Sequence, residues 1–283
     1  MAHPKRTIND TIPLTSLPSI AIPQLGFGTY LSPSEQAFAS CQHALREGYR
    51  HIDTAQYYAN EAEVGRAIAE SGISRGDIFV STKILETGTS VDENYSNAAR
   101  SLDLLGGYVD LFLIHSAQGG RQVRREMWLA LGRLFEEGKA RAIGVSNFGI
   151  EEIEELRGAG NVWPPHVNQI ELHPWCQQKE VVAYCESHGV VLQAYAPIVR
   201  NQKADFEPLV KLASKHGTSP NQILIRWSLQ RGWVCLPKSD APERIKLNAS
   251  VYDFDLDKED MEVLNGMDQG RQGAIVFAVS STV

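Results

Sequence analysis

The chain has 283 residues, 43% hydrophobic and 22% charged, a profile typical of a soluble globular protein with a sizeable core. With 27 basic against 34 acidic residues its net charge is −7, which argues against a nucleic-acid partner. No stretch approaches the roughly 18 consecutive apolar residues of a membrane span, and the N-terminus lacks an apolar segment, so we expect no membrane association and a cytoplasmic location.

The four cysteines are sparse and form no C-x-x-C pair. We therefore expect free thiols in a reducing compartment rather than a disulfide or a zinc site. No cluster of His, Cys, Asp or Glu has the spacing of metal ligands, so no metal is expected. The four are Cys41, Cys176, Cys185 and Cys235.

Residues 11 to 23 are expected to form a short hairpin that could close the bottom of a barrel. Eight short, nearly continuous apolar runs follow, a pattern typical of strands covered on both sides. These expected strands are residues 25–29, 51–53, 78–83, 109–115, 142–146, 167–170, 190–195 and 234–237.

Helical patterns lie between these strands, and several of them stop at a glycine, which suits the left-handed position just past a helix. The expected helices are residues 34–47, 61–71, 91–105, 123–137, 178–188, 207–216 and 220–231.

Eight strands alternating with helices predict an α/β fold, a (β/α)₈ TIM barrel in a single domain over residues 1–283. A doubly wound sheet is less well supported, because the segment from Gly26 to Leu31 lacks the third glycine of a dinucleotide fingerprint. The tail, residues 270–283, falls outside the pattern; it could cover a pocket at the barrel mouth or pack passively.

A polar side chain closes almost every apolar run, and in such barrels the active site lies at these strand ends. Asp53 can pair with Lys83 on the neighbouring strand, and Tyr58 lies on the loop that leaves Asp53. An ammonium near a tyrosine lowers the phenol pKa, and His115 adds a neutral donor. These four residues predict an acid–base site that polarises a carbonyl, for which hydride delivery by a cofactor is the natural partner reaction.

The ordered motifs of the chain resemble those of the aldo-keto reductases from Leu25 to about Leu264. They are Gly26-Phe27-Gly28-Thr29, the segment from Asp53 to Glu61, Thr82-Lys83, Leu113-Ile114-His115, Gly144-Val145-Ser146-Asn147-Phe148, the segment from Asn168 to Pro174, and Leu236-Pro237-Lys238-Ser239 with Pro242-Glu243-Arg244-Ile245.

The resemblance implies an NADPH-dependent reductase of aldehydes or ketones, acting on a small molecule as a monomer or weak homo-oligomer. Tyr58 would be the general acid, Lys83 would tune it, Asp53 would hold Lys83, and His115 would orient the carbonyl. The implied NADPH/NADP⁺ contacts are Gly28, Thr29, Asp53, Ser146, Asn147, Gln169, Tyr195, Lys238, Ser239, Arg244 and Asn248, with Tyr195 stacking on the nicotinamide and the Lys238, Ser239 and Arg244 side chains holding the 2′-phosphate.

Three departures from the family pattern concern the substrate pocket, expected at Tyr30, Tyr58, His115 and Ser116. Family members often carry Trp where this chain has Tyr30 and Ser116, and Leu-Trp where it has Ile84-Leu85, which predicts fewer aromatic walls. A non-catalytic cofactor-binding or regulatory protein on the same barrel remains an alternative, because a fold alone does not fix function.

Overall fold

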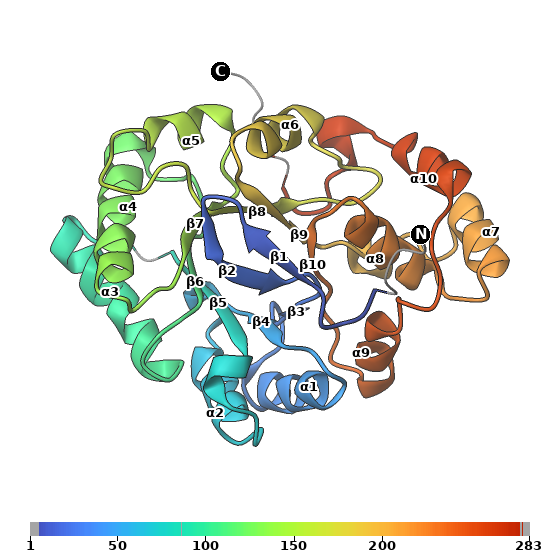
Figure 1. The fold of residues 1–283 in the computed structure, drawn as a ribbon, viewed down its shortest axis with the longest axis horizontal. Coiled ribbons are helices and arrows are strands. Elements are labelled where there is room, and N and C mark those ends of the chain that lie inside the picture. The colour runs from blue at the N-terminus through green and yellow to red at the C-terminus, as the bar shows by residue number, and fades with distance from the viewer. Residues whose placement is uncertain (1–5, 86, 278, 280–283) are drawn as a thin grey trace.

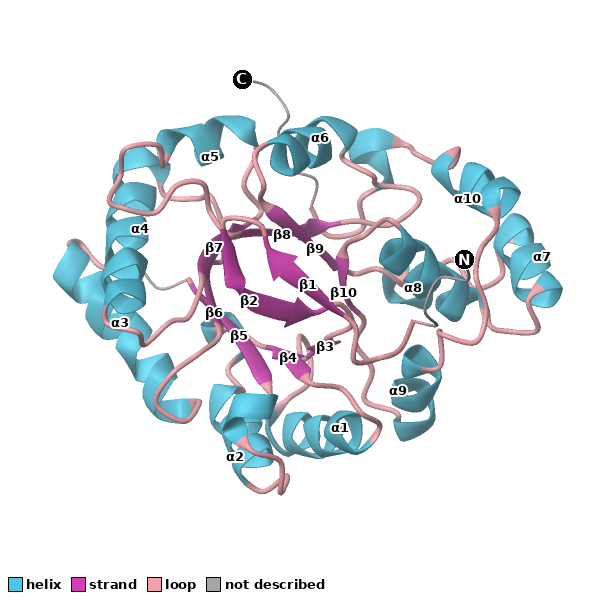
Figure 2. Ribbon diagram, in the orientation of Figure 1, coloured by secondary structure: helices cyan, strands magenta, loops and turns pink. Residues whose placement is uncertain are grey.

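The computed structural model describes residues 6–85, 87–277 and 279. Within them, eight parallel strands form a central sheet surrounded by helices (Figures 1 and 2). The strands are β3 (Phe27–Gly28), β4 (His51–Asp53), β5 (Phe79–Ile84), β6 (Leu111–Ile114), β7 (Ile143–Ser146), β8 (Val167–Glu171), β9 (Val191–Tyr195) and β10 (Val234–Leu236).

The strands pair in chain order from β3 to β10, and a parallel bridge between Leu25 and Cys235 joins the two edges. Backbone bonds on both sides of Cys235 support this closure: its N–H donates to Gln24 O at 2.8 Å, and its C=O accepts from Gly26 N at 2.9 Å. The expected (β/α)₈ barrel is confirmed, because all eight predicted strands are present within a residue or two of their expected ends.

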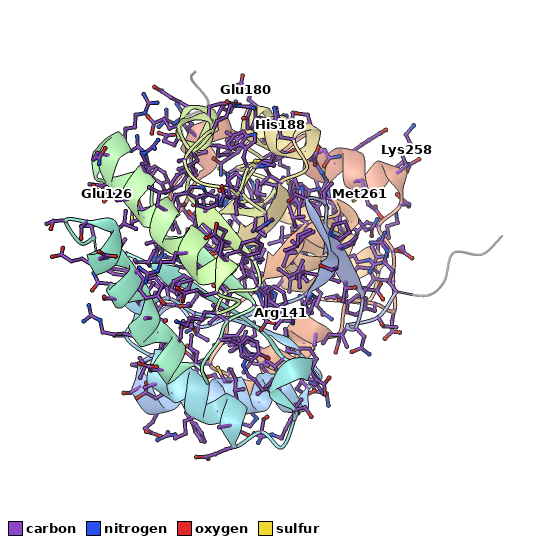
Figure 3. The ribbon with its side chains drawn as sticks, turned by 60° about the vertical axis from the view of Figure 1, so that its left-hand side comes forward. Glu126, Arg141, Glu180, His188, Lys258 and Met261 are labelled. Carbon is purple, nitrogen blue, oxygen red and sulfur yellow. The ribbon has the colours of Figure 1, made fainter. Side chains whose placement is uncertain are left out.

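The outer layer consists of helices whose apolar sides face the strands, and the expected helices are all present. Charged side chains such as Glu180 and Lys258 lie on their outer faces (Figure 3). The helices are α1 (Ser34–Arg46), α2 (Glu61–Ala69), α3 (Val91–Leu104), α4 (Gly120–Glu136), α5 (Ile150–Glu155), α6 (Lys179–Ser187), α7 (Glu207–Lys215), α8 (Pro220–Gln230), α9 (Pro242–Ala249) and α10 (Lys258–Asn265), with the 3₁₀ turns η1 (Gln56–Tyr58), η2 (Arg75–Asp77), η3 (Val199–Asn201) and η4 (Gly270–Gly273).

Helices α5, α9 and α10 were not among the expected helices, although the start of α10 carries a local signal. The Asp257 side chain accepts from Asp260 N at 2.9 Å, and Asp260 Oδ2 accepts from Asp257 N at 3.2 Å. This reciprocal pair satisfies two N–H groups at the helix start, as in a capping box. The Asp-x-x-Asp pattern could therefore have indicated the helix from sequence.

The predicted hairpin is confirmed as the antiparallel pair β1 (Thr11–Leu14) and β2 (Leu17–Pro23). It lies across one end of the barrel, at the centre of Figure 1. Its Leu14 and Ile22 are fully buried and pack against the barrel's inward-facing residues, including Val167 and Val234, which begin their strands. The hairpin therefore closes the amino-terminal end, and the opposite end is left for a site.

Candidate active site

Four side chains predicted from strand ends meet at the carboxyl-terminal end of the barrel. Asp53 is the last residue of β4, Lys83 lies near the end of the adjacent β5, and His115 directly follows β6. Tyr58 ends the 3₁₀ turn η1, which the chain forms five residues after Asp53. The parallel register brings these residues to one edge, because successive strands start and end at similar heights.

Lys83 is the centre of the group. Its side chain is fully buried, and Nζ donates to Asp53 Oδ1 at 2.6 Å, to the Thr54 carbonyl at 2.9 Å and to the Tyr58 hydroxyl oxygen at 3.1 Å. Three acceptors match the three protons of an ammonium, so the geometry fixes Nζ against the Tyr58 hydroxyl.

The charges in this group hold Lys83 protonated and Tyr58 neutral. Burial favours the uncharged amine, but the contacts with Asp53 and Tyr58 together outweigh it and raise the pKa of Lys83 above its ordinary value. Burial raises the pKa of the Tyr58 phenol, and the nearby Lys83 ammonium only partly offsets this effect. Lys83 thus lowers the pKa of Tyr58 as expected from the sequence, but burial outweighs this effect and the net shift is upward. The sequence pattern could not show how enclosed the ring is.

His115 stands beside the Tyr58 ring, edge to face at a centroid distance of 5.6 Å. Burial, with the charge of Lys83, lowers the pKa of His115 to about 3. The imidazole is therefore neutral at physiological pH. Its Nδ1 is buried without a hydrogen-bond partner among the described residues. A neutral ring in this position can orient a polar group but cannot supply a proton as an imidazolium.

Amide and hydroxyl groups extend the site across β7, β8 and β9. Gln169 Nε2 donates to Asp53 Oδ2 at 2.9 Å, and Ser146 Oγ donates to the Gln169 carbonyl at 2.8 Å. Asn147 has a left-handed backbone (φ 59°), and its Oδ1 accepts from the Tyr195 hydroxyl at 2.8 Å. These bonds hold the amides and the Tyr195 ring in fixed positions beside the tyrosine and lysine.

Two cations lie at the other end of the site, beyond β10. Arg244, on α9, donates from Nε to Ser239 Oγ at 3.1 Å. Lys238 Nζ forms an ion pair with Asp240 and donates to the Leu31 carbonyl at 3.3 Å. Asn248 lies one turn further along α9. The sequence-predicted group of Lys238, Ser239, Arg244 and Asn248 is thus brought together, with Asp240 as an unexpected acidic member.

One cavity of about 640 Å³ connects the two ends. Of the predicted residues, Thr29, Lys83 and Ser116 are not part of its wall. Thr29 and Lys83 lie buried behind it, and the Ser116 hydroxyl instead accepts from Gln118 N at 3.3 Å. The predicted residues that do line the cavity are Gly28, Tyr30, Asp53, Tyr58, His115, Ser146, Asn147, Gln169, Tyr195, Lys238, Ser239, Arg244 and Asn248.

Residues 24–269 match the model of the aldo/keto reductase family. The chain belongs to this family. It is 48% identical to an uncharacterised oxidoreductase of Schizosaccharomyces pombe, over 87% of this chain and 90% of that protein. It is 37% identical to a glyoxal reductase of Bacillus subtilis, over 93% of this chain and 94% of that protein. A crystal structure of a Bombyx mori aldo-keto reductase in complex with NADP superposes with a TM-score of 0.86 at 31% identity, covering 96% of each chain.

This aldo/keto reductase lines its cavity with further residues that the sequence reasoning missed. Leu31 directly follows the predicted pocket residue Tyr30, and Tyr57 directly precedes Tyr58. Their place in the sequence could therefore have indicated them. Asp240 follows the Leu236-Pro237-Lys238-Ser239 motif, Leu236 begins it, and Ala196 directly follows Tyr195. Val276 lies in the tail that was expected to be able to cover the pocket, whereas nothing local pointed to the remaining ones. The missed residues are Leu31, Tyr57, Ala196, Pro197, Ile198, Arg200, Asn201, Asn221, Leu236, Asp240 and Val276.

The C-terminal tail of the reductase reaches this cavity, since Val276 forms part of its wall. Of the predicted tail, residues 278 and 280–283 lie outside the described residues. In the described part of the enzyme, no group of three or more His, Cys, Asp or Glu side chains is arranged to hold a metal ion. Nor does any helix there have the length and apolar character needed to cross a membrane.

Proposed function

We propose that this enzyme reduces aldehyde or ketone carbonyls of small molecules to alcohols with NADPH, and that Tyr58 is the general acid. The observation that carries the proposal is that Tyr58 lines the cavity and that a buried ammonium, Lys83 Nζ, lies 3.1 Å from its hydroxyl oxygen. A neutral phenol backed by a fixed cation can release its proton to an oxygen in the cavity.

The donor set of the cavity fits a nicotinamide dinucleotide phosphate. Asn147, Gln169 and Ser146 offer amide and hydroxyl groups suited to a carboxamide, and Tyr195 offers an aromatic ring beside them. Lys238 and Arg244 supply cations for a 2′-phosphate, with the Ser239 hydroxyl between them and the α9 N-terminus close by. NADPH bound in this cavity would supply the hydride.

The protein's own part in the reaction is the movement of one proton. Tyr58 holds that proton at physiological pH, because its pKa is raised. As the proton leaves toward the carbonyl oxygen, the phenolate that remains accepts a hydrogen bond from Lys83 Nζ and is stabilised by its charge. Asp53 keeps Lys83 in place, and neutral His115 can orient the carbonyl oxygen beside Tyr58.

The test replaces Tyr58 by Phe, which removes the transferable proton and little volume. We expect kcat to fall by roughly 10² to 10⁴-fold, while the Kd for NADPH, measured by quenching of protein fluorescence, stays within about twofold of wild type. Tyr57→Phe is the matched control, because Tyr57 lines the same cavity and packs on His115, and no hydrogen bond from Lys83 reaches it.

Wild-type turnover by Tyr58→Phe would mean that another group is the acid. The alternative of a non-catalytic cofactor-binding or regulatory protein requires that wild type binds NADPH and reduces none of a panel of aldehydes, α-keto esters and ketones. The Asp53, Tyr58 and Lys83 arrangement speaks against this alternative, since binding alone does not need an ammonium against a phenol.

A further inference from the structure

Two glutamines lie side by side inside the barrel, on neighbouring strands. Gln169 on β8 pairs in register with Gln193 on β9, and both side chains are buried. Gln169 Nε2 donates to Gln193 Oε1 at 2.8 Å and to Asp53 Oδ2 at 2.9 Å. Because Asp53 also accepts from Lys83, a continuous set of hydrogen bonds runs from Gln193 to the proposed acid–base group.

The two bonds from Nε2 determine which end of the Gln169 amide is left for a ligand. A side-chain amide nitrogen carries two protons, and both are used here. The backbone is also fixed, since the Gln169 carbonyl accepts from Ser146 Oγ at 2.8 Å and from Asn147 N at 3.0 Å. Gln169 lines the cavity, so it can offer a bound molecule only its acceptor, Oε1.

We propose that Gln193 is a positioning residue that holds the Gln169 amide in the orientation in which Oε1 accepts from the carboxamide N–H of the nicotinamide. The proposal rests on the proposed use of NADPH. Within the described residues, Gln193 is not part of the cavity wall. It therefore acts through Gln169 rather than by touching the cofactor.

Two acceptors hold the Gln169 amide more firmly than Asp53 could alone. Asp53 lies on β4 and Gln193 on β9, so the two bonds fix the Nε2 group from different strands. Without Gln193, one buried N–H would lose its partner, and the amide would gain by turning that N–H toward an acceptor in the cavity. A turned amide presents a donor where the carboxamide N–H requires an acceptor.

The surroundings of Gln193 argue against a purely structural role. Its side chain is fully buried, and its Nε2 has no hydrogen-bond partner among the described residues. Its neighbour in register on β10 is Val234, a buried apolar residue. A buried N–H without a partner costs free energy, so an apolar side chain would suit this position at least as well if only stability mattered.

Binding measurements test this role without turnover. Gln193→Met keeps the length of the side chain and removes the acceptor. We expect the Kd for NADP⁺ to rise roughly two- to tenfold, the effect of one hydrogen bond, while the Kd for adenosine 2′,5′-bisphosphate, which lacks the nicotinamide, stays within about twofold of wild type. Isothermal titration measures both values. An equal rise for both ligands, or no rise for either, would overturn the proposal.

The 3-acetylpyridine analogue of NADP⁺ makes the test specific for the carboxamide. Its acetyl group has no N–H and cannot donate to Gln169 Oε1. Wild type should bind NADP⁺ more tightly than this analogue by roughly two- to tenfold, and Gln193→Met should lose most of that difference. Undiminished discrimination in Gln193→Met, or none in wild type, would contradict the assignment.

Gln24→Met is the matched control. Gln24 is also a buried glutamine, and its Nε2 donates to the Leu229 carbonyl at 2.8 Å. The change removes a buried hydrogen bond of the same kind away from the cavity wall, and it should leave every Kd within about twofold of wild type. Adding Gln193→Met to Gln169→Met should weaken NADP⁺ binding no further, because Gln193 acts through Gln169. Additive losses would show that it acts elsewhere.

Exchange of the Gln169 side-chain amide protons, followed by NMR without ligand, tests the anchoring itself. We expect slow exchange in wild type and exchange at least about tenfold faster in Gln193→Met; equal rates would overturn the anchoring. Thermal unfolding checks that the variant folds, and Gln193→Leu replaces it if it does not. If wild type binds NADP⁺ but reduces no carbonyl compound, the reductase function fails while the binding ratios still decide the role of Gln193. A wild type that binds no NADP⁺ would overturn both.

Discussion

Asp240 introduces a carboxylate among the cations of the Lys238–Arg244 end of the cavity. Its Oδ1 accepts from the Ser32 hydroxyl at 2.5 Å and from the Ser40 hydroxyl at 3.0 Å, and its Oδ2 pairs with Lys238 Nζ. Both serines are buried, so the carboxylate is firmly held. Lys238 is therefore already paired at the position where a phosphate is proposed to bind.

This arrangement predicts that Asp240→Asn binds NADP⁺ more tightly. The amide oxygen can still accept from Ser32 and Ser40, while the negative charge that repels a phosphate and engages Lys238 is removed. Since a hydrogen bond to a charged group contributes about 1.5–3 kcal/mol, we expect the Kd for NADP⁺ to fall by roughly tenfold or more and that for NAD⁺ to change little. Isothermal titration with both nucleotides measures the two values.

Arg244→Ala provides the opposite control, because it removes a cation from the same group and should weaken NADP⁺ binding by roughly tenfold or more. Equal changes for NADP⁺ and NAD⁺ in both variants would show that the 2′-phosphate binds elsewhere. The proposed use of NADPH thus depends on two cations, Lys238 and Arg244, whose attraction for the 2′-phosphate is opposed by the Asp240 carboxylate.

At the scale of elements, the β1–β2 hairpin is separated from the chemistry by the length of the barrel. Its buried residues cluster with the first residues of five strands, whereas Asp53 and Tyr195 are the last residues of theirs. The five are Phe79, Leu111, Val167, Val191 and Val234. The hairpin can therefore contribute to stability without touching the cavity.

Ile22→Ala should lower the free energy of unfolding by about 2–5 kcal/mol, because the fully buried side chain leaves a void between hairpin and barrel. Ile20 lies on the same strand but is only half-buried, so Ile20→Ala should lower the free energy of unfolding by clearly less. Urea unfolding measures both. A loss of kcat/KM in folded Ile22→Ala beyond about twofold would contradict the separation of the two ends.

For the whole molecule, acid stability should depend on histidines that the fold keeps neutral. Burial lowers the pKa of His51 to about 4, and burial with the charge of Lys83 lowers that of His115 to about 3. At pH values between these lowered pKa values and the ordinary histidine pKa near 6.5, these histidines bind protons in the unfolded chain but not in the folded chain. Stability therefore falls as the pH drops through this window and is unaffected by these groups above it.

The expected loss is up to about 1.4 kcal/mol per pH unit for each histidine. His51→Gln should flatten the dependence of the unfolding free energy on pH between 6.5 and 4 relative to wild type, as measured by urea unfolding at several pH values. An identical slope in both proteins would show that His51 does not titrate in this way. His51 lies inside β4 and bonds Ser81 through Nε2 at 2.6 Å, so the variant is tested for folding first.

The local sequence pattern was enough to predict the order of the eight barrel strands, and with it the proposed catalytic group. An apolar run indicates a buried strand, and a polar residue at its end indicates where that strand leaves the core. Because the strands are parallel, these polar ends lie at one edge of the barrel. This is why Asp53, Lys83 and His115 could be predicted to converge, with Tyr58 on the adjoining loop.

Which distant segments meet became visible in the folded barrel alone. Glu171 contacts Val276, Asp240 contacts Ser40, and Leu25 closes the barrel against Cys235, each across 100 positions or more. The upward shift of the Tyr58 pKa and the position of Ser116 outside the cavity wall likewise depend on tertiary contacts rather than on the local sequence. A local sequence pattern indicates which face of a helix or strand is buried. Which segment covers that face depends on how the barrel closes, because closure sets the distances between elements that are far apart in the chain.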